Sequence, residues 1–411
     1  MRLAGRLGAL QERDFRLFFL GQTTSLLGDG MVPVALSFAV LDLTGSITDL
    51  GLVLAARSIP MIAFLLVGGV FADRLPRRTV MISADLLRFG SQGLVAALLI
   101  SGHAQIWQII VLQAVNGGAT AFFNPALTGL TPALVSRERL QQANVLRGMS
   151  MGLGGIIGPA LAGILVETVG SGWALAVDSL SFAVSAFFLA QLHLPPHVRL
   201  PAQSFLRDLH DGWKEVRSRT WLWVGVLAAS IGNMMTAPFL ILGADISRTS
   251  LGGAGAWALI VAAFSAGSFA GGLAALRIRP RRPFFFSFAC FLPFGLPMLL
   301  LALGAPATGV AVGGFIAGAG VTVGNAVWET TLQQQIDPQA LSRVTAYDWF
   351  GSLAFQPLGS ALTGPVALAI GADPTLIGAF AIVTCVNLAA LSTPSIRGVV
   401  AQPRPATVVA D

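Results

Sequence analysis

The stretch GGVFADRLPRR, residues 68–78, places four charged side chains between two runs of sequence that are almost entirely apolar. The run before it ends in IAFLLV (62–67), and the run after it continues as GLVAALLI (93–100). A helix needs roughly 20 apolar residues to cross a bilayer, and both runs approach that length. Short basic gaps between such runs are typical of cytoplasmic loops that join two membrane-spanning helices.

The composition of the whole chain also indicates a membrane protein. Of its 411 residues, 55% are hydrophobic and only 11% are charged, whereas soluble domains carry about 25% charged residues. The net charge of +6 comes largely from arginines in the short gaps, so we expect the lipid bilayer as a partner and no nucleic acid. Cys290 and Cys385 lie inside apolar runs and predict neither a disulfide framework nor a metal site.

Twelve apolar runs follow one another along the chain. An irregular crossing would leave backbone polar groups unpaired in lipid, and the runs are too long for barrel strands, so each run is expected to be a helix. The predicted fold class is therefore all-α, a polytopic membrane protein with twelve transmembrane helices. The runs cover residues 15–41, 48–72, 79–101, 104–126, 141–168, 172–193, 220–244, 254–276, 284–303, 307–329, 344–369 and 374–393.

Arginines outside the runs are concentrated in alternate gaps, and the remaining gaps hold almost none beyond Arg248. The positive-inside rule then predicts that both termini and the central loop are cytoplasmic, with the chain crossing the inner (plasma) membrane. We predict an N-terminal six-helix bundle (1–193), a cytoplasmic linker with an amphipathic surface helix (194–219), a C-terminal six-helix bundle (220–393) and a cytoplasmic tail (394–411).

The two halves share a sequence pattern. Asn124 pairs with Asn325, and Gly158 with Gly359, at one offset of 201 (325 minus 124). The tripeptide PRR at 76–78 recurs at 280–282. Because both halves begin and end on the same side, the repeat is expected to be parallel, with its axis along the membrane normal.

These features resemble the major facilitator superfamily of transporters. GGVFADRLPRR resembles the signature loop between the second and third helices of that family, although Pro76 replaces the usual glycine. LAARSIP (54–60), SADLLRFG (83–90) and QQQIDPQALSRVTAYDWFG (333–351) resemble the branch that contains macrolide and enterobactin-type siderophore exporters. The positions in register with the signature are Gly69, Asp73, Arg74, Arg77 and Arg78.

The resemblance implies that this loop forms a gate, and physical chemistry gives a reason. Small residues allow helix backbones to approach closely. Asp73 can face the positive N-terminal end of a neighbouring helix, expected to be the eleventh, in a contact that exists only when the inner gate is shut. The alternative is that the arginines simply anchor the loop at the membrane surface.

The stretch GGIIGPALAG (154–163) resembles the glycine–proline antiporter motif of the family. Gly154, Gly158, Pro159 and Gly163 are in register, and Ala162 stands where glycine is usual. Proline removes a helix hydrogen bond and kinks the span, while the small residues form a close-packing face. Ordinary tight packing is the alternative to a specific role in blocking leaks.

Asp29 is the candidate for proton coupling. It lies 14 residues after Phe15 (29 minus 15), or roughly 21 Å along a helix, which places it near mid-membrane. A carboxyl group desolvated there can load and release a proton near physiological pH. The alternative is a structural hydrogen bond or an ion pair with Arg57. Asp85 and Arg88, three residues apart, are expected to form a local ion pair.

The substrate cavity is predicted from a set of polar and apolar side chains within the spans. Arg57 could attract an anionic substrate, hold Asp29 charged, or only anchor its span. Asp178, Glu329 and Asp348 lie near the ends of their runs, where a structural role is expected. The other cavity candidates, for which packing or lipid contact is the alternative, are Asn233, Met234, Trp257 and Phe264.

Features of enzymes are missing from the sequence. The four histidines form no group with carboxylates or cysteines, and no Walker loop is present, so we expect neither catalysis, nor a cofactor, nor ATP as energy source. The leading hypothesis is proton-coupled export of a small amphipathic compound (a drug, secondary metabolite or siderophore) by a monomer through alternating access. The alternatives are a facilitator or importer of a polar metabolite, and a non-transporting sensor or scaffold.

Overall fold

The computed structural model describes residues 8–136, 139–193 and 213–400, with the backbone alone described at 65–74 and at a few positions near 128–132 and 338–343. Across these ranges it contains helices and turns and no strand. The helices of the N-terminal half are η1 (Gly8–Gln11), α1 (Arg13–Asp29), α2 (Val32–Thr44), α3 (Ile47–Arg74), α4 (Arg77–Ile100), α5 (Ile106–Leu130), η2 (Thr131–Ala133), α6 (Leu140–Thr168) and α7 (Ser171–Ala190). Those of the C-terminal half are α9 (Thr220–Ile246), η4 (Ser247–Leu251), α10 (Ala254–Ala275), α11 (Pro283–Phe291), η5 (Leu292–Gly295), α12 (Leu296–Ala302), α13 (Ala307–Gln335), α14 (Pro338–Leu353), α15 (Gln356–Ile370), α16 (Ala372–Ser392) and α17 (Pro394–Gly398).

Twelve helical segments are long and apolar enough to cross a membrane. Each coincides with one of the twelve apolar runs to within several residues, so the predicted all-α, twelve-span fold is confirmed. Helices suit these runs because every backbone N–H and C=O within a helix is paired inside the segment itself.

Three spans are interrupted where the sequence had suggested continuous helices. The first divides into α1 and α2 around Gly30 and Met31, and the ninth into α11, η5 and α12. The eleventh divides into α14 and α15 between Leu353 and Gln356. Each break has a proline at the start of the following helix (Pro33, Pro297 and Pro357), and a proline cannot donate the backbone hydrogen bond that would continue the preceding helix.

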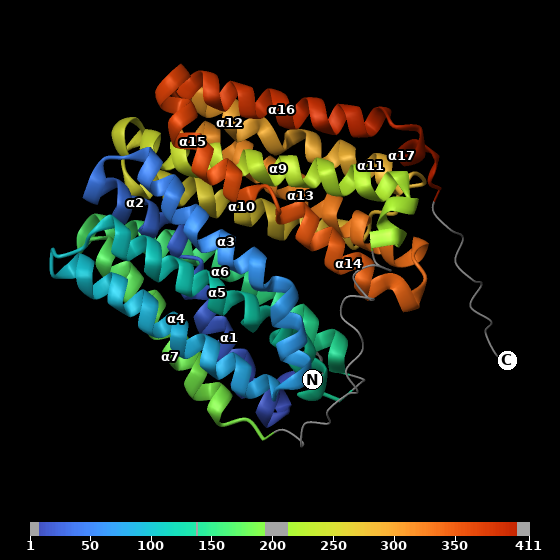
Figure 1. Cartoon of the computed structure of the whole chain (residues 1–411), viewed down its shortest axis with the longest axis horizontal. Helices are drawn as coiled ribbons and strands as arrows, with labels where there is room; N and C mark the ends of the chain where they lie inside the picture. The colour runs from blue at the N-terminus through green and yellow to red at the C-terminus, as the bar shows by residue number, and fades with distance from the viewer. Residues whose placement is uncertain (1–7, 137–138, 194–212, 401–411) are drawn as a thin grey trace.

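The helices form two bundles, α1–α7 and α9–α16, which lie side by side in Figure 1. Two helix pairs make the most extensive contacts between the bundles: α6 packs on α10, and α3 packs on α15. These are the fifth span with the eighth and the second with the eleventh. A repeat of six spans exchanges the two pairs, which is the interface that a parallel two-fold repeat produces.

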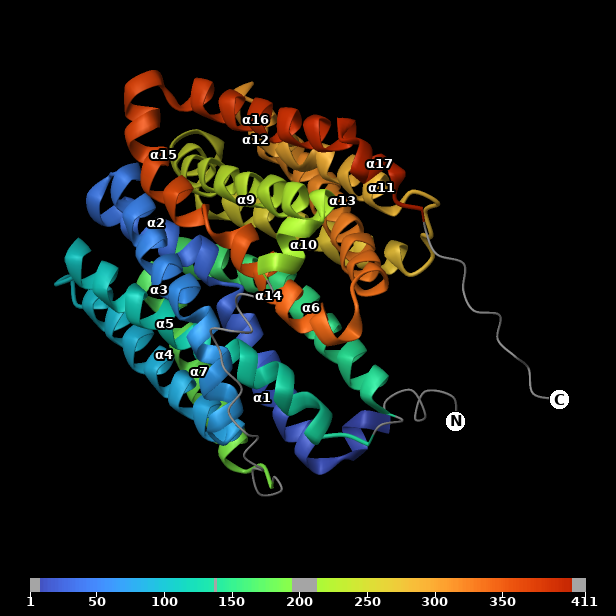
Figure 2. The same ribbon diagram turned by 45° about the vertical axis from the view of Figure 1, so that its right-hand side comes forward.

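The apolar core is shared by the two halves at one end of the molecule only. One cluster of buried side chains contains residues from both halves, among them Phe38, Leu50, Phe239 and Trp257. The other two clusters each lie in a single half, around Phe15 and around Trp221. The ribbons of the two halves accordingly run close together near α2 and α15 and separate toward the end where α14 and α17 lie (Figures 1 and 2).

We call the end where the two halves share an apolar core, near α2 and α15, the joined end, and the opposite end the separated end. Polar contacts reinforce the joined end. Arg248 Nε lies 2.8 Å from Asp42 Oδ1 in the other half. The backbone N–H of Gly255, in the first turn of α10, donates a 2.7 Å hydrogen bond to Glu167 Oε1 at the end of α6. A carboxylate at a helix N-terminus is favoured by the unpaired N–H groups and the helix dipole there.

Two predicted features lie largely outside the described residues. The amphipathic linker helix falls on residues 194–212, and most of the tail falls on 401–411.

Candidate functional site

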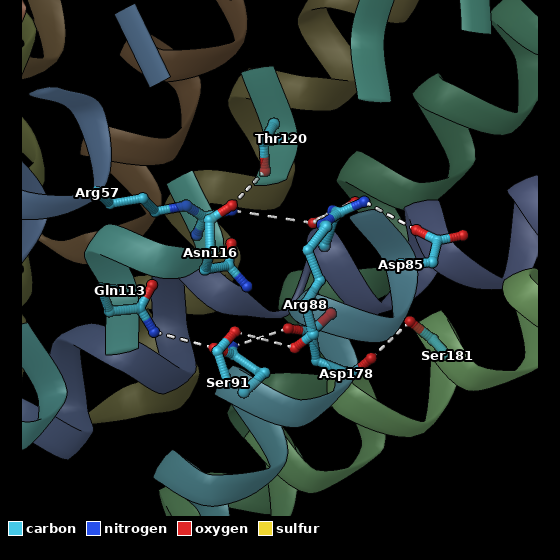
Figure 3. Close-up of polar contacts among 11 residues, drawn as sticks. Arg57, Asp85, Arg88, Ser91, Gln113, Asn116, Thr120, Asp178 and Ser181 are labelled. Atoms are coloured by element: carbon cyan, nitrogen blue, oxygen red, sulfur yellow. Dashed lines mark hydrogen bonds and ion pairs between the residues drawn. The ribbon is translucent and has the colours of Figure 1, made fainter. Parts of the chain in front are cut away.

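Charged side chains converge inside the N-terminal half, where α1, α3, α4 and α7 meet (Figure 3). Asp29 is the last residue of α1, at the break in the first span. Arg88 Nη2 of α4 lies 2.7 Å from Asp29 Oδ1 and 2.8 Å from Oδ2. Arg57 Nη2 of α3 is more distant, at 3.9 Å from Oδ1. The sequence had suggested Arg57 as the partner of Asp29, but Arg88 makes the closer contact.

Arg88 is enclosed by its partners. Its Nη1 lies 3.4 Å from Asp85 Oδ1, so the pair predicted from the spacing of these two residues is present. Its guanidinium carbon is 3.8 Å from the ring centroid of Phe182 and 5.4 Å from that of Phe123. A guanidinium removed from water needs anionic and aromatic neighbours of this kind to offset its lost hydration.

A second polar chain runs from Asp178 into the bundle. Gln92 Nε2 donates a 2.8 Å hydrogen bond to Asp178 Oδ2, and Gln113 Nε2 donates a 2.9 Å bond to Gln92 Oε1. Asp178 is completely buried, and its Oδ1 accepts no hydrogen bond from any described residue. A methyl group in place of the Gly28 hydrogen would come within 2.7 Å of that oxygen, so Asp178 lies against the backbone that carries Asp29.

This polar chain was not predicted from the sequence. Asp178, for which a structural role near the end of its run was expected, lies seven residues after the start of α7 (178 minus 171) and is completely buried. A signal was available, because Gln92 follows Arg88 by one helical turn and a glutamine is costly within lipid unless it is paired.

The charged groups of the cluster do not balance. The three carboxylates of Asp29, Asp85 and Asp178 share two guanidinium groups, those of Arg57 and Arg88. With every group ionised the cluster would carry one net negative charge in an environment that penalises unpaired charge, and binding one proton removes it. Asp85 and Asp178 are fully buried, whereas about 28% of the Asp29 side chain is exposed.

The C-terminal half has a cavity of about 360 Å³ between α9, α10, α11, α13, α14 and α16. We call it the aromatic cavity. Its lining includes Phe264, Phe288, Phe291, Phe294, Trp328 and Trp349, together with the polar side chains of Asn233, Thr236, Asn325, Glu329, Asp348, Ser352 and Asn387.

Two of the predicted cavity residues line this cavity and three do not. Asn233 and Phe264 are part of its wall. Arg57 belongs to the charged cluster of the other half, and the backbone of Met234 packs against Gly359 of α15. Trp257 follows the packing alternative, because its side chain is fully buried, against Phe239, with Nε1 3.4 Å from the carbonyl oxygen of Pro33 in the other half.

The predicted gate motif is described only in part. Gly69, Asp73 and Arg74 belong to the last turns of α3, where the side chains are outside the described residues, so the Asp73 contact stays a prediction. Arg78 donates from Nε to the carbonyl oxygen of Leu189 at 3.0 Å and from Nη2 to that of Ala190. Arg78 therefore caps the C-terminal end of α7 within its own half.

The predicted glycine–proline motif lies in α6, where it packs against both halves. Gly154 and Gly158 face the break in the first span: an added methyl group would come within 2.6 Å of Leu26 O at Gly154 and of the Gly30 carbonyl carbon at Gly158. At Gly163 it would meet Ala258 Cβ of α10 at 2.7 Å. Pro159 lies within the same helix. The motif is a close-packing face between α1, α6 and α10.

A model of the Major Facilitator Superfamily matches residues 18–362. Macrolide efflux protein A of Streptococcus pyogenes is 24% identical over 263 residues, which are 63% of this chain and 65% of that protein. Enterobactin exporter EntS of Citrobacter koseri is 28% identical over 265 residues, 63% of this chain and 62% of that protein. The matches thus span less than two thirds of these relatives.

Solved structures resemble the whole chain more closely in shape than in sequence. A mutant form of the nucleoside transporter NupG superposes with a TM-score of 0.77 at 12% identity, covering 92% of this chain and 99% of that one. A bacterial homologue of the human lysosomal transporter Spinster, in an inward-facing and unoccupied conformation, gives a TM-score of 0.70 at 15% identity, covering 92% and 93%. At these identities the likeness concerns the fold alone.

Proposed function

Because the chain belongs to the Major Facilitator Superfamily, we propose that it is a proton-coupled exporter of a small amphipathic compound, working by alternating access. The relatives named for macrolide efflux and enterobactin export support the outward direction of transport. We further propose that it acts as a monomer in the inner membrane with both termini in the cytoplasm, as the distribution of arginines favours.

The observation that carries the coupling is the charge imbalance of the buried cluster. Three carboxylates against two guanidinium groups favour the uptake of one proton. We assign the exchange to Asp29, because it alone of the three carboxylates is partly exposed, while Asp85 and Asp178 are sealed. Protonation of Asp29 weakens its contact with Arg88, and that contact ties α1 to α4.

The same geometry supports alternating access. The joined end is held by the Asp42–Arg248 ion pair, by the hydrogen bond from Gly255 of α10 to Glu167 of α6, and by the shared apolar core. Export requires this end to open while the separated end closes. Loosening α1 at the Asp29–Arg88 contact reaches the joined end through Gly30, against which α6 packs by way of Gly154 and Gly158.

The test is substrate-dependent proton movement in everted membrane vesicles that contain the protein. A pH-sensitive dye reports the imposed gradient, and a macrolide and enterobactin serve as candidate substrates because the relatives are named for them. Wild-type vesicles should release protons when one of these compounds is added. Asp29→Asn should abolish that response while leaving protein in the membrane, whereas Asp49→Asn, a carboxylate change at the start of α3, should not.

Other outcomes lead to other functions. If substrate moves equally with and without a pH gradient, the protein is a facilitator and not a proton-coupled exporter. If intact cells accumulate the compound, the chain is an importer. A response of Asp29→Asn equal to that of wild type would remove Asp29 from the coupling.

A further inference from the structure

The described lining of the aromatic cavity is acidic. Among its described lining residues are two carboxylates, Glu329 of α13 and Asp348 of α14, and no lysine, arginine or histidine. The charged cluster of the N-terminal half, in contrast, holds two arginines beside its three carboxylates. Any compound that enters the aromatic cavity encounters carboxyl groups and aromatic side chains.

The two carboxylates are not equivalent. Asp348 Oδ2 accepts a 3.2 Å hydrogen bond from Trp328 Nε1. This bond uses part of the hydrogen-bond accepting capacity of the carboxylate and holds the side chain in place. Glu329 accepts no hydrogen bond and forms no ion pair with any residue in the described part of the chain. Its side chain is exposed to the cavity, so its charge is available to a ligand.

The walls beside Glu329 suit a cation as well. Trp328 and Phe288 are largely buried against each other, at 6.1 Å between ring centroids. The more exposed rings of the lining are those of Phe264, Phe291, Phe294 and Trp349. The faces of aromatic rings attract cations, most strongly where water is excluded. A volume of about 360 Å³ is within the range of small-molecule sites.

An anionic ligand has no comparable partner among the described residues that line the cavity. Guanidinium groups are present in the N-terminal cluster, and Arg88 there contacts both Asp29 and Asp85. Arg57 faces Asp29 at 3.9 Å and lies in the half opposite the cavity. The hypothesis that Arg57 attracts an anionic substrate therefore loses support.

We infer, on the basis of the proposed exporter function, that the aromatic cavity binds an amphipathic cation. The ligand class is a compound with an apolar or aromatic body and a positively charged amine or onium group. Glu329 is the residue that selects for the charge, while Phe264 and the other rings bind the apolar body.

The test measures ligand binding to the protein and not transport, so no pH gradient is required. Tetraphenylphosphonium serves as the cationic probe, because its charge does not change with pH, and triphenylphosphine oxide as the neutral probe. Affinities are measured by equilibrium dialysis with purified protein in lipid nanodiscs. Glu329→Gln should weaken binding of the cation about tenfold, which corresponds to 1.4 kcal/mol, and leave the affinity for the neutral probe nearly unchanged.

Three further variants keep the result interpretable. Glu329→Asp retains the charge and should keep the preference for the cation. Phe264→Leu removes an aromatic wall and should weaken both probes. Asp373→Asn removes an exposed carboxylate from the first turn of α16, outside the cavity lining, and should bind both probes as wild type does.

The inference is overturned if wild-type protein does not bind tetraphenylphosphonium, or if Glu329→Gln binds it equally well. Equal loss of both probes in Glu329→Gln would also overturn it, because the residue would then be structural. These outcomes are independent of the vesicle experiment. If the probes fail to bind but substrate still drives proton release, the cation site is wrong and the exporter function is kept. If the cation binds but substrate drives no proton release, the cation site is kept and the exporter function is wrong.

Discussion

Arg88 is the residue on which the N-terminal cluster depends. It lies within hydrogen-bond or ion-pair distance of Asp29 and Asp85, and its guanidinium faces the ring of Phe182. The side chain is only 4% exposed. Removing one partner of a buried ion pair is more harmful than removing both, because the remaining charge keeps its desolvation cost without compensation.

We therefore expect Arg88→Gln to destabilise the protein strongly, by about 3–5 kcal/mol. The double variant Arg88→Gln with Asp29→Asn should recover part of this loss, since it removes the uncompensated carboxylate. The measurement is the melting temperature of purified protein, followed by size-exclusion chromatography of heated samples. Arg13→Gln breaks the more exposed Arg13–Asp14 contact and should cost less than about 1 kcal/mol. A double variant as unstable as Arg88→Gln would contradict this account of the cluster.

At this scale the sequence predicts local contacts well and distant ones poorly. The pairing of Asp85 with Arg88 follows from their spacing on one helix. Asp29, expected to be desolvated from its depth in an apolar run, keeps about 28% of its side chain exposed. The contact between Arg88 and Asp29 joins residues 59 positions apart and depends on how α4 packs against α1. Hydropathy carries no information on that packing. The exposed, unpaired state of Glu329 likewise depends on the shape of the surrounding cavity.

Among the elements, α1 and α6 pack so closely that the contact restricts substitution. The first span breaks after Asp29, and the backbone at Gly30 packs directly on α6. A methyl group at Gly158 would lie 2.6 Å from the Gly30 carbonyl carbon, 2.7 Å from Gly30 Cα and 2.8 Å from Leu27 O. These are backbone atoms, so neither helix can yield by rotating a side chain, and the helices must move apart.

The resulting prediction compares two glycines of the same helix. Gly158→Ala should lower the melting temperature, because overpacking costs about 1–3 kcal/mol. Gly148 also lies in α6 but has open space where a methyl group would be. Gly148→Ala should be neutral or stabilise the protein by about 0.5–1 kcal/mol, since alanine is the better helix former. Equal melting temperatures for the two variants would show that α1 and α6 are not closely packed.

The elements themselves were predictable because their cause is local. A run of about 20 apolar residues has no favourable state in lipid other than a helix, so twelve runs gave twelve spans. The breaks within the first, ninth and eleventh spans were not anticipated, although Pro33, Pro297 and Pro357 mark them. Proline is tolerated within other spans of this chain, such as Pro159 in α6, so its presence alone does not locate a break.

Over the whole molecule, the two ends differ in both packing and charge. At the joined end the halves share an apolar core, and the only arginine in a connection at that end, within the described residues, is Arg248, which is paired with Asp42. The other end carries the remaining arginines of the described helix ends and loops, at the starts of α1, α4, α6 and α9, in the loop before α11, and in α17. The parallel repeat places these positions on one side of the membrane.

This asymmetry predicts the orientation of the protein. Lysine and arginine near the ends of spans are retained in the cytoplasm, so the arginine-rich end, with α17, should be cytoplasmic, and the joined end should face the periplasm. Green fluorescent protein fused after Gly398 should therefore fluoresce. Alkaline phosphatase, whose disulfides form only in an oxidising compartment, should be inactive at the same position. Inserted at Gly102, in the turn between α4 and α5 at the joined end, the phosphatase should be active. The reverse pattern of reporter activity at both positions would show that the protein has the opposite orientation in the membrane. The separated end would then open outward, and the Asp29 cluster would be reached from the side opposite to the one that export by this mechanism requires.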